Sequence, residues 1–274
     1  FTSRNVVAKV EGGDPALRDT YVSFGAHYDH IGVASVTAAS AAASPGSCSG
    51  GASAPAGSDR IFNGADDNAS GTATLLAMAR ALAEGPRPRR SVLLTWFTGE
   101  ERGLWGSRRF VADPPVPLSS IVAHVNLDMV GRSFQDRGEY ANTIFVAGSD
   151  WISSELHGIV VGTNGALAQP LDMNFAFNDP RHPDLVYYRG DHYSFAARGV
   201  PSVFITTGGP GDYHAPTDTA DKLDYEKMAR IGAYSVELAR QLANLDHAVR
   251  RDGLGPRAGV STAPRTDAAP PETK

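Results

Sequence analysis

Apolar runs and amphipathic segments alternate along this chain, an order typical of an α/β protein. Two almost continuous apolar runs, residues 91–98 (SVLLTWFT) and 120–127 (SIVAHVNL), predict strands buried on both faces of a sheet. Before these two runs, residues 69–83 predict a helix that ends before Gly85 and Pro86. The apolar face expected on this helix consists of Leu75, Leu76, Ala79 and Leu82.

Further elements follow from the same reasoning. Strands are predicted at residues 5–11, 20–26, 142–147 and 201–206, and helices at 103–112, 151–161, 191–197 and 224–247, with an irregular segment at 165–188. The connector GGDPALRD between the first two strands suits an antiparallel pair. We therefore expect a three-layer α/β/α fold: a mixed, mostly parallel central sheet, opened by an antiparallel hairpin, with helices on both faces.

Length and composition predict one domain. The 274 residues are 42% hydrophobic and contain no internal repeat, which suits a single core over residues 1–252. Residues 34–58 are Ala, Ser, Gly or Pro except for Val36, Thr37 and Cys48, a composition too poor in apolar surface to offset its ordering entropy. We expect an insertion loop there and a disordered tail at 253–274.

Charge and cysteine usage narrow the class of partner. The chain has 25 basic and 30 acidic residues and no long basic run, so we expect no nucleic-acid partner. No apolar run approaches the roughly 18 residues of a membrane helix, so we expect no membrane span. A first residue of Phe1 rather than Met suggests a trimmed or mature piece. With Cys48 as the single cysteine, any metal must be held by imidazole and carboxylate.

Acidic and imidazole residues follow the ends of the predicted strands. Because ligands bind at the carboxyl ends of strands in such sheets, these residues are expected to meet at one edge. Carboxylates that close repel one another unless a cation neutralises them, so the pattern predicts a cation site. The residues concerned are His27, Asp66, Glu100, Glu101, Asp128 and His214.

Two of these motifs have alternatives when taken alone. NGADDNASG, residues 63–71, places two carboxylates among small residues before a helix, which suits a cation site or a solvated turn capped by Asn68 or Ser70. In His27-Tyr28-Asp29, the Asp29 carboxylate could fix the imidazole tautomer, or both side chains could merely solvate a strand end.

Six motifs together give the chain a family resemblance. They are GAHYDHIG, NGADDNASG, TGEERGLWGS, NLDMVGR, GDHYSFAARGVPS and YHAPTDTADKLDYEKMARI. In order and approximate spacing they resemble the co-catalytic dizinc exopeptidases of the bacterial leucyl aminopeptidase type, relatives of glutaminyl cyclases and glutamate carboxypeptidases. The resemblance covers about residues 5–245 and implies that residues 1–252 form a metallopeptidase catalytic domain. Departures from the family pattern are Gly190, Ala215 and Thr217, together with the insertion.

The resemblance implies a role for each site residue. Asp66 would bridge two zinc ions, with Asp67 and Asp29 in supporting positions around the ligands. The implied metal ligands are His27, Asp66, Glu101, Asp128 and His214. Glu100 is left to act as general base on the attacking water, and Tyr213 would help to hold the tetrahedral intermediate.

Other residues are given simpler interpretations. His124 is expected to be a core histidine, and His30 is expected at the surface. His192 with Asp191 is expected to cap the turn that follows. The residues proposed to line a substrate pocket are Arg189, Asp191, Tyr193 and Phe204.

The predicted activity is therefore zinc-dependent removal of the N-terminal residue from peptides with a free N-terminus. A carboxypeptidase, a glutaminyl-cyclase-like enzyme and a non-catalytic binding ectodomain are the alternatives on this fold. Tyr213, where cyclases tend to have Trp, favours hydrolysis, and retention of every implied ligand favours an enzyme. The resemblance also suggests a secreted or periplasmic monomer.

Overall fold

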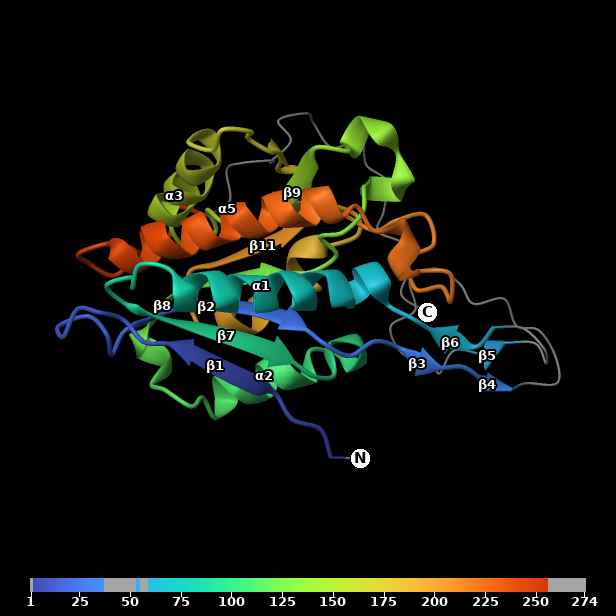
Figure 1. Cartoon of the computed structure of the whole chain (residues 1–274). Helices are drawn as coiled ribbons and strands as arrows, with labels where there is room; N and C mark the ends of the chain where they lie inside the picture. Colours follow the sequence, from blue (N-terminus) through green and yellow to red (C-terminus); the bar gives the residue numbers. More distant parts are fainter. Residues whose placement is uncertain (1, 37–52, 55–58, 256–274) are drawn as a thin grey trace.

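A seven-stranded mixed sheet forms the centre of the protein (Figure 1). The computed structural model describes residues 2–36, 53–54 and 59–255. Strand order across the sheet is β1-β7-β2-β8-β11-β9-β10. The strands are β1 (Val6–Val10), β2 (Tyr21–His27), β7 (Ser91–Phe97), β8 (Ile121–Leu127), β9 (Thr143–Ala147), β10 (Asp172–Asn174) and β11 (Ser202–Thr206).

Four neighbouring strands, β7, β2, β8 and β11, run parallel. Each is buried along its whole length, as the continuous apolar runs predicted. Strands β1 and β9 are antiparallel to their neighbours β7 and β11, and β10 is parallel to β9. The predicted mixed, mostly parallel sheet is thus confirmed.

The expected hairpin between the first two strands is wrong. Strand β7 lies between β1 and β2 and pairs with both. Of β1, β2 and β7, strand β7 has the most continuous apolar run. A position inside the sheet, between β1 and β2, allows this strand to be buried on both faces. Strand β10 was also missed, because its three residues lie in a segment without periodicity.

Helices cover both faces of the sheet (Figure 1). On one face α1, α3 and α5 pack against the larger core cluster, and on the other α2 and α4 enclose Phe97, Phe110 and Phe195. The helices are α1 (Gly71–Glu84), α2 (Trp105–Ala112), α3 (Ser154–Gly165), α4 (His192–Ala196) and α5 (Tyr225–Asn244). Each of the five predicted helices is confirmed, with boundary shifts of a few residues.

Short helical turns connect these elements. A π-helical turn, η1 (Ala65–Ser70), precedes α1, and a 3₁₀ turn, η2 (Glu100–Arg102), follows β7. The others are η3 (Leu118–Ser120), η4 (Phe134–Asp136), η5 (Gly138–Tyr140), η6 (Ala176–Asn178), η7 (Val186–Tyr188) and η8 (Ala220–Lys222).

Two small sheets lie beside the central one. Strands β3 (Gly32–Val33) and β6 (Ile61–Phe62) pair antiparallel, and β4 (Ser35–Val36) and β5 (Ser53–Ala54) pair parallel. These strands bracket the low-complexity segment predicted at 34–58, most of which, like most of the predicted tail at 253–274, falls outside the described residues.

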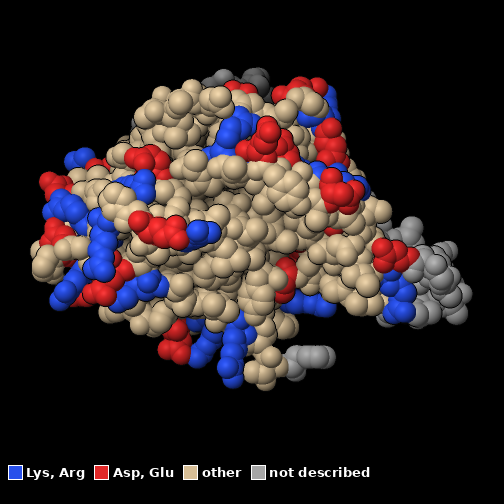
Figure 2. Space-filling model, in the orientation of Figure 1, with Lys and Arg blue, Asp and Glu red and all other residues tan. Residues whose placement is uncertain are grey.

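The surface carries both signs of charge. On the face seen in Figure 2, basic and acidic side chains alternate and no extended basic field forms. None of the helices in the described part of the chain is long and apolar enough to cross a membrane.

Helix α1 differs from its predicted apolar face at one position. Leu75, Met78 and Leu82 are buried against the core, whereas Leu76 is 56% exposed. Residues one position apart point about 100° away from each other, so Leu75 and Leu76 cannot share a narrow buried face.

Replacing each of these leucines by alanine should show that burial decides how much each one stabilises the fold. Leu75→Ala leaves a cavity under α1 and should lower the free energy of unfolding by about 2–5 kcal/mol. Leu76→Ala removes the same atoms from a mostly exposed position and should change it by less than about 0.5 kcal/mol. Urea denaturation of both variants measures the difference. Equal losses would show that the face of α1 is assigned incorrectly.

Candidate metal centre

His27, the last residue of β2, starts the site at the carboxyl edge of the sheet. Its side chain is only 1% exposed. Its Nε2 lies 3.1 Å from an oxygen of Asp67 and 3.2 Å from an oxygen of Asp128, the residue that follows β8. We call His27, Asp67 and Asp128 the inner group.

Asp67, rather than Asp66, occupies the centre of the site, and this corrects the prediction. The Asp66 carboxylate instead accepts a hydrogen bond of 2.7 Å from the Gly131 amide. A β-carbon at Gly131 would lie 2.9 Å from the Ser70 β-carbon, so this close approach needs glycine. Asp67 has non-helical angles (φ −106°, ψ 90°) inside η1, which turn its side chain away from that of Asp66.

Asp29 supports His27 through its backbone, and this also corrects the prediction. The Asp29 carbonyl oxygen lies 2.9 Å from His27 Nδ1, whereas the nearest carboxylate oxygen is 3.9 Å away. The carboxylate accepts a hydrogen bond of 2.7 Å from the Gly99 amide instead. Asp29 therefore fixes the imidazole and ties the end of β2 to the turn that carries the two glutamates.

Asp67 also belongs to a second cluster, which we call the outer group: His30, Asp67, Glu101 and His214. His214 Nε2 lies 3.0 Å from an Asp67 oxygen and 3.1 Å from a Glu101 oxygen. His30 Nδ1 lies 2.8 Å from the other Glu101 oxygen, with its side chain 8% exposed. The expectation that His30 is a surface residue is therefore wrong.

These imidazoles and carboxylates approach closely without forming aligned hydrogen bonds. Five buried atoms have no hydrogen-bond partner among the described residues: His27 Nε2, His30 Nδ1, Glu101 Oε1, Asp128 Oδ1 and His214 Nε2. Atoms bound to one zinc ion at about 2.0–2.2 Å lie about 3–3.5 Å apart. The contacts of His27 and His214, at 3.0–3.2 Å, have this spacing. Lone pairs that converge without a shared proton therefore fit a bound cation.

The electrostatics of the site also call for positive charge. Burial lowers the pKa of His214, but the carboxylates of Asp67 and Glu101 outweigh burial and raise it to about 10. For His27 burial is likewise outweighed, chiefly by Asp128, and its pKa is raised. Burial raises the pKa of Asp67, yet the close contacts with His214 and His27 hold it far below its usual range.

Glu100 lies beside the inner group, on the turn after β7. Gly99 (φ 70°) and Gly103 (φ 101°) adopt left-handed conformations at either end of this turn, which favour glycine. Glu100 and Glu101 both line the same cavity, but only Glu101 faces the imidazoles of the outer group. Burial and the neighbouring carboxylates, notably Asp128 and Asp191, raise the pKa of Glu100 despite the opposing effect of His27.

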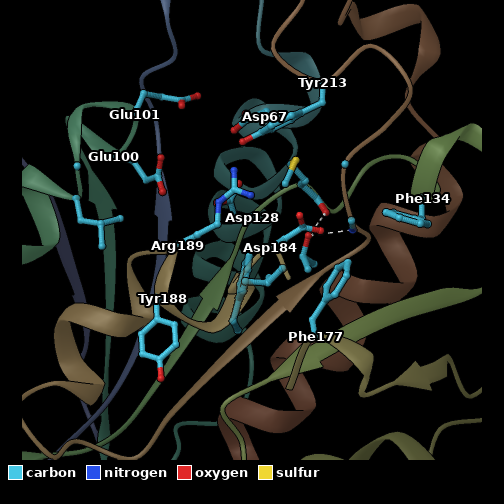
Figure 3. A pocket seen from close by; sticks show the side chains of 18 of the residues that line it. Asp67, Glu100, Glu101, Asp128, Phe134, Phe177, Asp184, Tyr188, Arg189 and Tyr213 are labelled. Atoms are coloured by element: carbon cyan, nitrogen blue, oxygen red, sulfur yellow. Dashed lines mark hydrogen bonds between the residues drawn. The ribbon is translucent and has the colours of Figure 1, made fainter. Parts of the chain in front are cut away.

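Tyr213 stands next to His214 on the loop after β11. The two rings stack with centroids 3.8 Å apart. The phenol lines the cavity and extends toward Asp67 (Figure 3). Burial and then the charges of Asp67 and Glu101 raise the Tyr213 pKa, so the hydroxyl keeps its proton and can donate a hydrogen bond.

A buried charge network joins the loop of His214 to the turn of Asp67. One Asp218 carboxylate accepts hydrogen bonds from the Asp66 amide at 3.0 Å and the Asp67 amide at 3.2 Å. The Arg132 guanidinium lies 3.7 Å from Asp218 and pairs with Asp212. The positions of Asp67 and His214 are thereby coupled, a role that sequence motifs alone did not indicate.

A cavity of about 440 Å³ opens over both groups (Figure 3). Glu100 and Glu101 lie on one side, Phe134 and Phe177 lie on the other, and Arg189 lies between them. The aromatic wall was missed because η4 and η6 are short turns with no periodicity. The remaining lining residues include Leu104, Arg108, Met129, Asp184, Val186, Tyr188, Phe204 and Tyr213.

Two of the four predicted pocket residues are in place. Arg189 and Phe204 line the cavity, whereas Asp191 and Tyr193 are not among its described lining residues. Asp191 is fully buried below the site and does not cap α4 with its side chain, which corrects both expectations for it. His124 stacks on Phe195 with centroids 3.7 Å apart, which confirms it as a core histidine.

Solved structures share this fold. The aminopeptidase from Aneurinibacillus sp. strain AM-1 aligns with a TM-score of 0.62 at 21% identity, over 92% of this chain and 50% of that one. The glutaminyl cyclase of Porphyromonas gingivalis aligns with a TM-score of 0.60 at 20% identity, over 86% of this chain and 77% of that one.

Sequence relatives match about two thirds of the chain. A probable leucine aminopeptidase of Arthroderma otae is 29% identical over 193 residues, 66% of this chain and 48% of the relative. A probable zinc metalloprotease of Leptosphaeria maculans is 36% identical over 198 residues, 62% of this chain and 46% of the relative. The chain thus spans about half the length of these curated relatives.

Family membership follows from the match to a family model. Peptidase family M28 matches residues 5–239. That range includes every strand of the central sheet, both metal-candidate groups and most of α5. Since the match covers most of the chain, the protein belongs to Peptidase family M28.

Proposed function

We propose that the protein is a zinc-dependent aminopeptidase that removes the N-terminal residue of a peptide. The observation that carries this proposal is the convergence of unpaired imidazole and carboxylate atoms on Asp67, at the floor of a cavity that Glu100 also lines. Relatives named leucine aminopeptidase and zinc metalloprotease support the same reaction.

Two ions would be held, one by each group, with Asp67 shared. Its two carboxylate oxygens face different imidazoles: Oδ1 faces His27 and Oδ2 faces His214. Imidazole and carboxylate ligands of this kind suit zinc, although cobalt or manganese can occupy such sites. Two bound zinc ions would supply Lewis acidity to the attacking water and to the scissile carbonyl.

Glu100 and Tyr213 would perform the proton and hydrogen-bond steps. Glu100 lines the cavity and forms no ion pair among the described residues, whereas Glu101 and Asp128 each contact an imidazole, so Glu100 is available to take a proton from water and return it to the leaving amine. Tyr213, held protonated, would donate a hydrogen bond to the oxyanion that develops on the substrate carbonyl.

The cavity supports an aminopeptidase with an apolar preference. Glu100 and Asp128 offer negative charge to an α-ammonium group. Phe134, Phe177 and Phe204 form an apolar wall on which a large N-terminal side chain could pack. We therefore expect Leu and Phe to be preferred at the N-terminus.

A carboxypeptidase is the second candidate, and one observation favours it. Arg108 and Arg189 both line the cavity, and guanidinium groups bind carboxylates well. A glutaminyl-cyclase-like reaction is less favoured, because Tyr213 offers a donor to the oxyanion of hydrolysis. The substrate experiment below separates the first two activities.

Metal uptake should release protons. In the metal-free chain the pKa of His214 is raised to about 10, so near pH 7 its imidazole is protonated and must lose that proton to ligate a metal. Apparent zinc affinity should therefore rise as pH increases from 6 to 9. Calorimetric titration in two buffers of different ionisation enthalpy measures the release, and a pH-independent affinity without proton release would contradict this protonation state.

Substitution of Glu100 and of Glu101 should affect zinc binding and turnover differently. Glu100→Gln should retain zinc and lose about 10²–10⁴-fold in kcat, because a general base is removed but no ligand is. Glu101→Gln should weaken zinc binding. Elemental analysis and turnover are measured together, with Glu84→Gln on the far end of α1 as the control. Near-normal turnover by Glu100→Gln would assign the base elsewhere.

Acetylation of the substrate should decide between the two peptidase activities. Leu- or Phe-anilide with a free amine should be cleaved, and the N-acetylated compound should not, because acetylation removes the charge that Glu100 and Asp128 face. Equal cleavage of both compounds, or release of C-terminal residues from N-blocked peptides, would instead support the carboxypeptidase.

A further inference from the structure

His30 is the buried imidazole at the site whose role neither motif spacing nor the proposed reaction explains. Its Nδ1 lies 2.8 Å from Glu101 Oε1 and 3.8 Å from Asp67 Oδ2. His214 approaches the same two carboxylates through the opposite oxygen of Glu101. Glu101 therefore lies between two imidazoles.

The His30 ring is held in a fixed orientation by its surroundings. It meets the His214 ring edge to face, with centroids 5.5 Å apart and planes at 72°. On another side it packs on the Gly64 backbone, where a β-carbon would lie 2.6 Å from His30 Cγ. Gly64 adopts a left-handed conformation (φ 64°), so both its backbone and its lack of a side chain suit this contact.

The contact between His30 and Glu101 does not have hydrogen-bond geometry. Both ring nitrogens of His30 are buried, and neither has a hydrogen-bond partner in the part of the chain that the structure describes. A buried imidazole nitrogen without a partner destabilises the fold, and a bound cation would offset this cost. Because the His30 nitrogen and the Glu101 oxygen approach each other without an aligned proton, both have a lone pair to offer to one ion.

We infer that His30 is a fourth protein ligand of the ion in the outer group, beside Asp67, Glu101 and His214. This inference rests on the proposed two-metal function. It makes the two sites unequal: four side chains surround the outer ion, whereas three surround the inner one near Glu100. Closed four-ligand sites are typical of tightly held zinc, and sites with an open position are typical of catalytic zinc.

The experiment compares zinc binding by the wild-type chain, His30→Ala and His30→Asn. Asparagine places an amide nitrogen near the position of Nδ1, so it can donate a hydrogen bond to Glu101 but is a poor zinc ligand. His247→Asn, an exposed histidine outside the site, is the matched control. Zinc content after dialysis, competition with a chelator, and the visible absorption of the cobalt-substituted forms are measured, and thermal melting verifies folding.

The wild-type chain and the control should bind two zinc ions. Both His30 variants should bind one ion normally and the second at least about tenfold more weakly, since even outer partners of ligands contribute about 10–100-fold to affinity. Their cobalt spectra should change in the band of the second ion.

Wild-type zinc affinity in His30→Asn would overturn the inference. If His30→Ala then bound zinc weakly, His30 would be a positioning residue that acts by hydrogen bonding and not a ligand. A wild-type chain that binds fewer than two ions would overturn the proposed two-metal function itself.

Discussion

Mutual repulsion among buried carboxylates is the constraint on which this site depends. Asp67, Glu100, Glu101 and Asp128 line one cavity, and the side chains of Asp67, Glu101 and Asp128 are at most 8% exposed. Charges of one sign at such distances are tolerated only with compensating positive charge. The imidazoles of His27 and His214 provide it when protonated, and a cation provides it when they ligate. The Asp29 carbonyl fixes the His27 imidazole, and Asp218 fixes the backbone of Asp66 and Asp67, so the charged groups stay in place against this repulsion.

The sequence was most informative where one physical requirement dominates. Strands β7 and β8 are apolar on both faces, so burial alone indicated central parallel strands and placed Glu100 and Asp128 at their carboxyl ends. The pairing of strands could not be predicted in this way, because the sequence of β1 fits either β2 or β7 as a neighbour. The long-range arrangement of the core decides between them.

Adjacent residues were harder to separate. Asp66 and Asp67 are adjacent and have the same side chain, and the backbone angles of η1 decide which one faces the imidazoles. His30 was misassigned for a related reason. Its burial comes from Gly64, Glu101 and His214, which are distant in sequence and converge only in the folded chain. The aromatic wall likewise comes from turns whose sequence has no period.

The order in which the site residues occur along the chain has a kinetic consequence. His27 and His214 are far apart in the sequence. The site residues between them come from η1 and from the ends of β7 and β8. The full set therefore exists only after four parallel strands have paired, which requires long loops to close first. A cation bound there would stabilise the native state more than the transition state for folding. It would slow unfolding while leaving the folding rate nearly unchanged, so a bound metal would lengthen the lifetime of the folded protein.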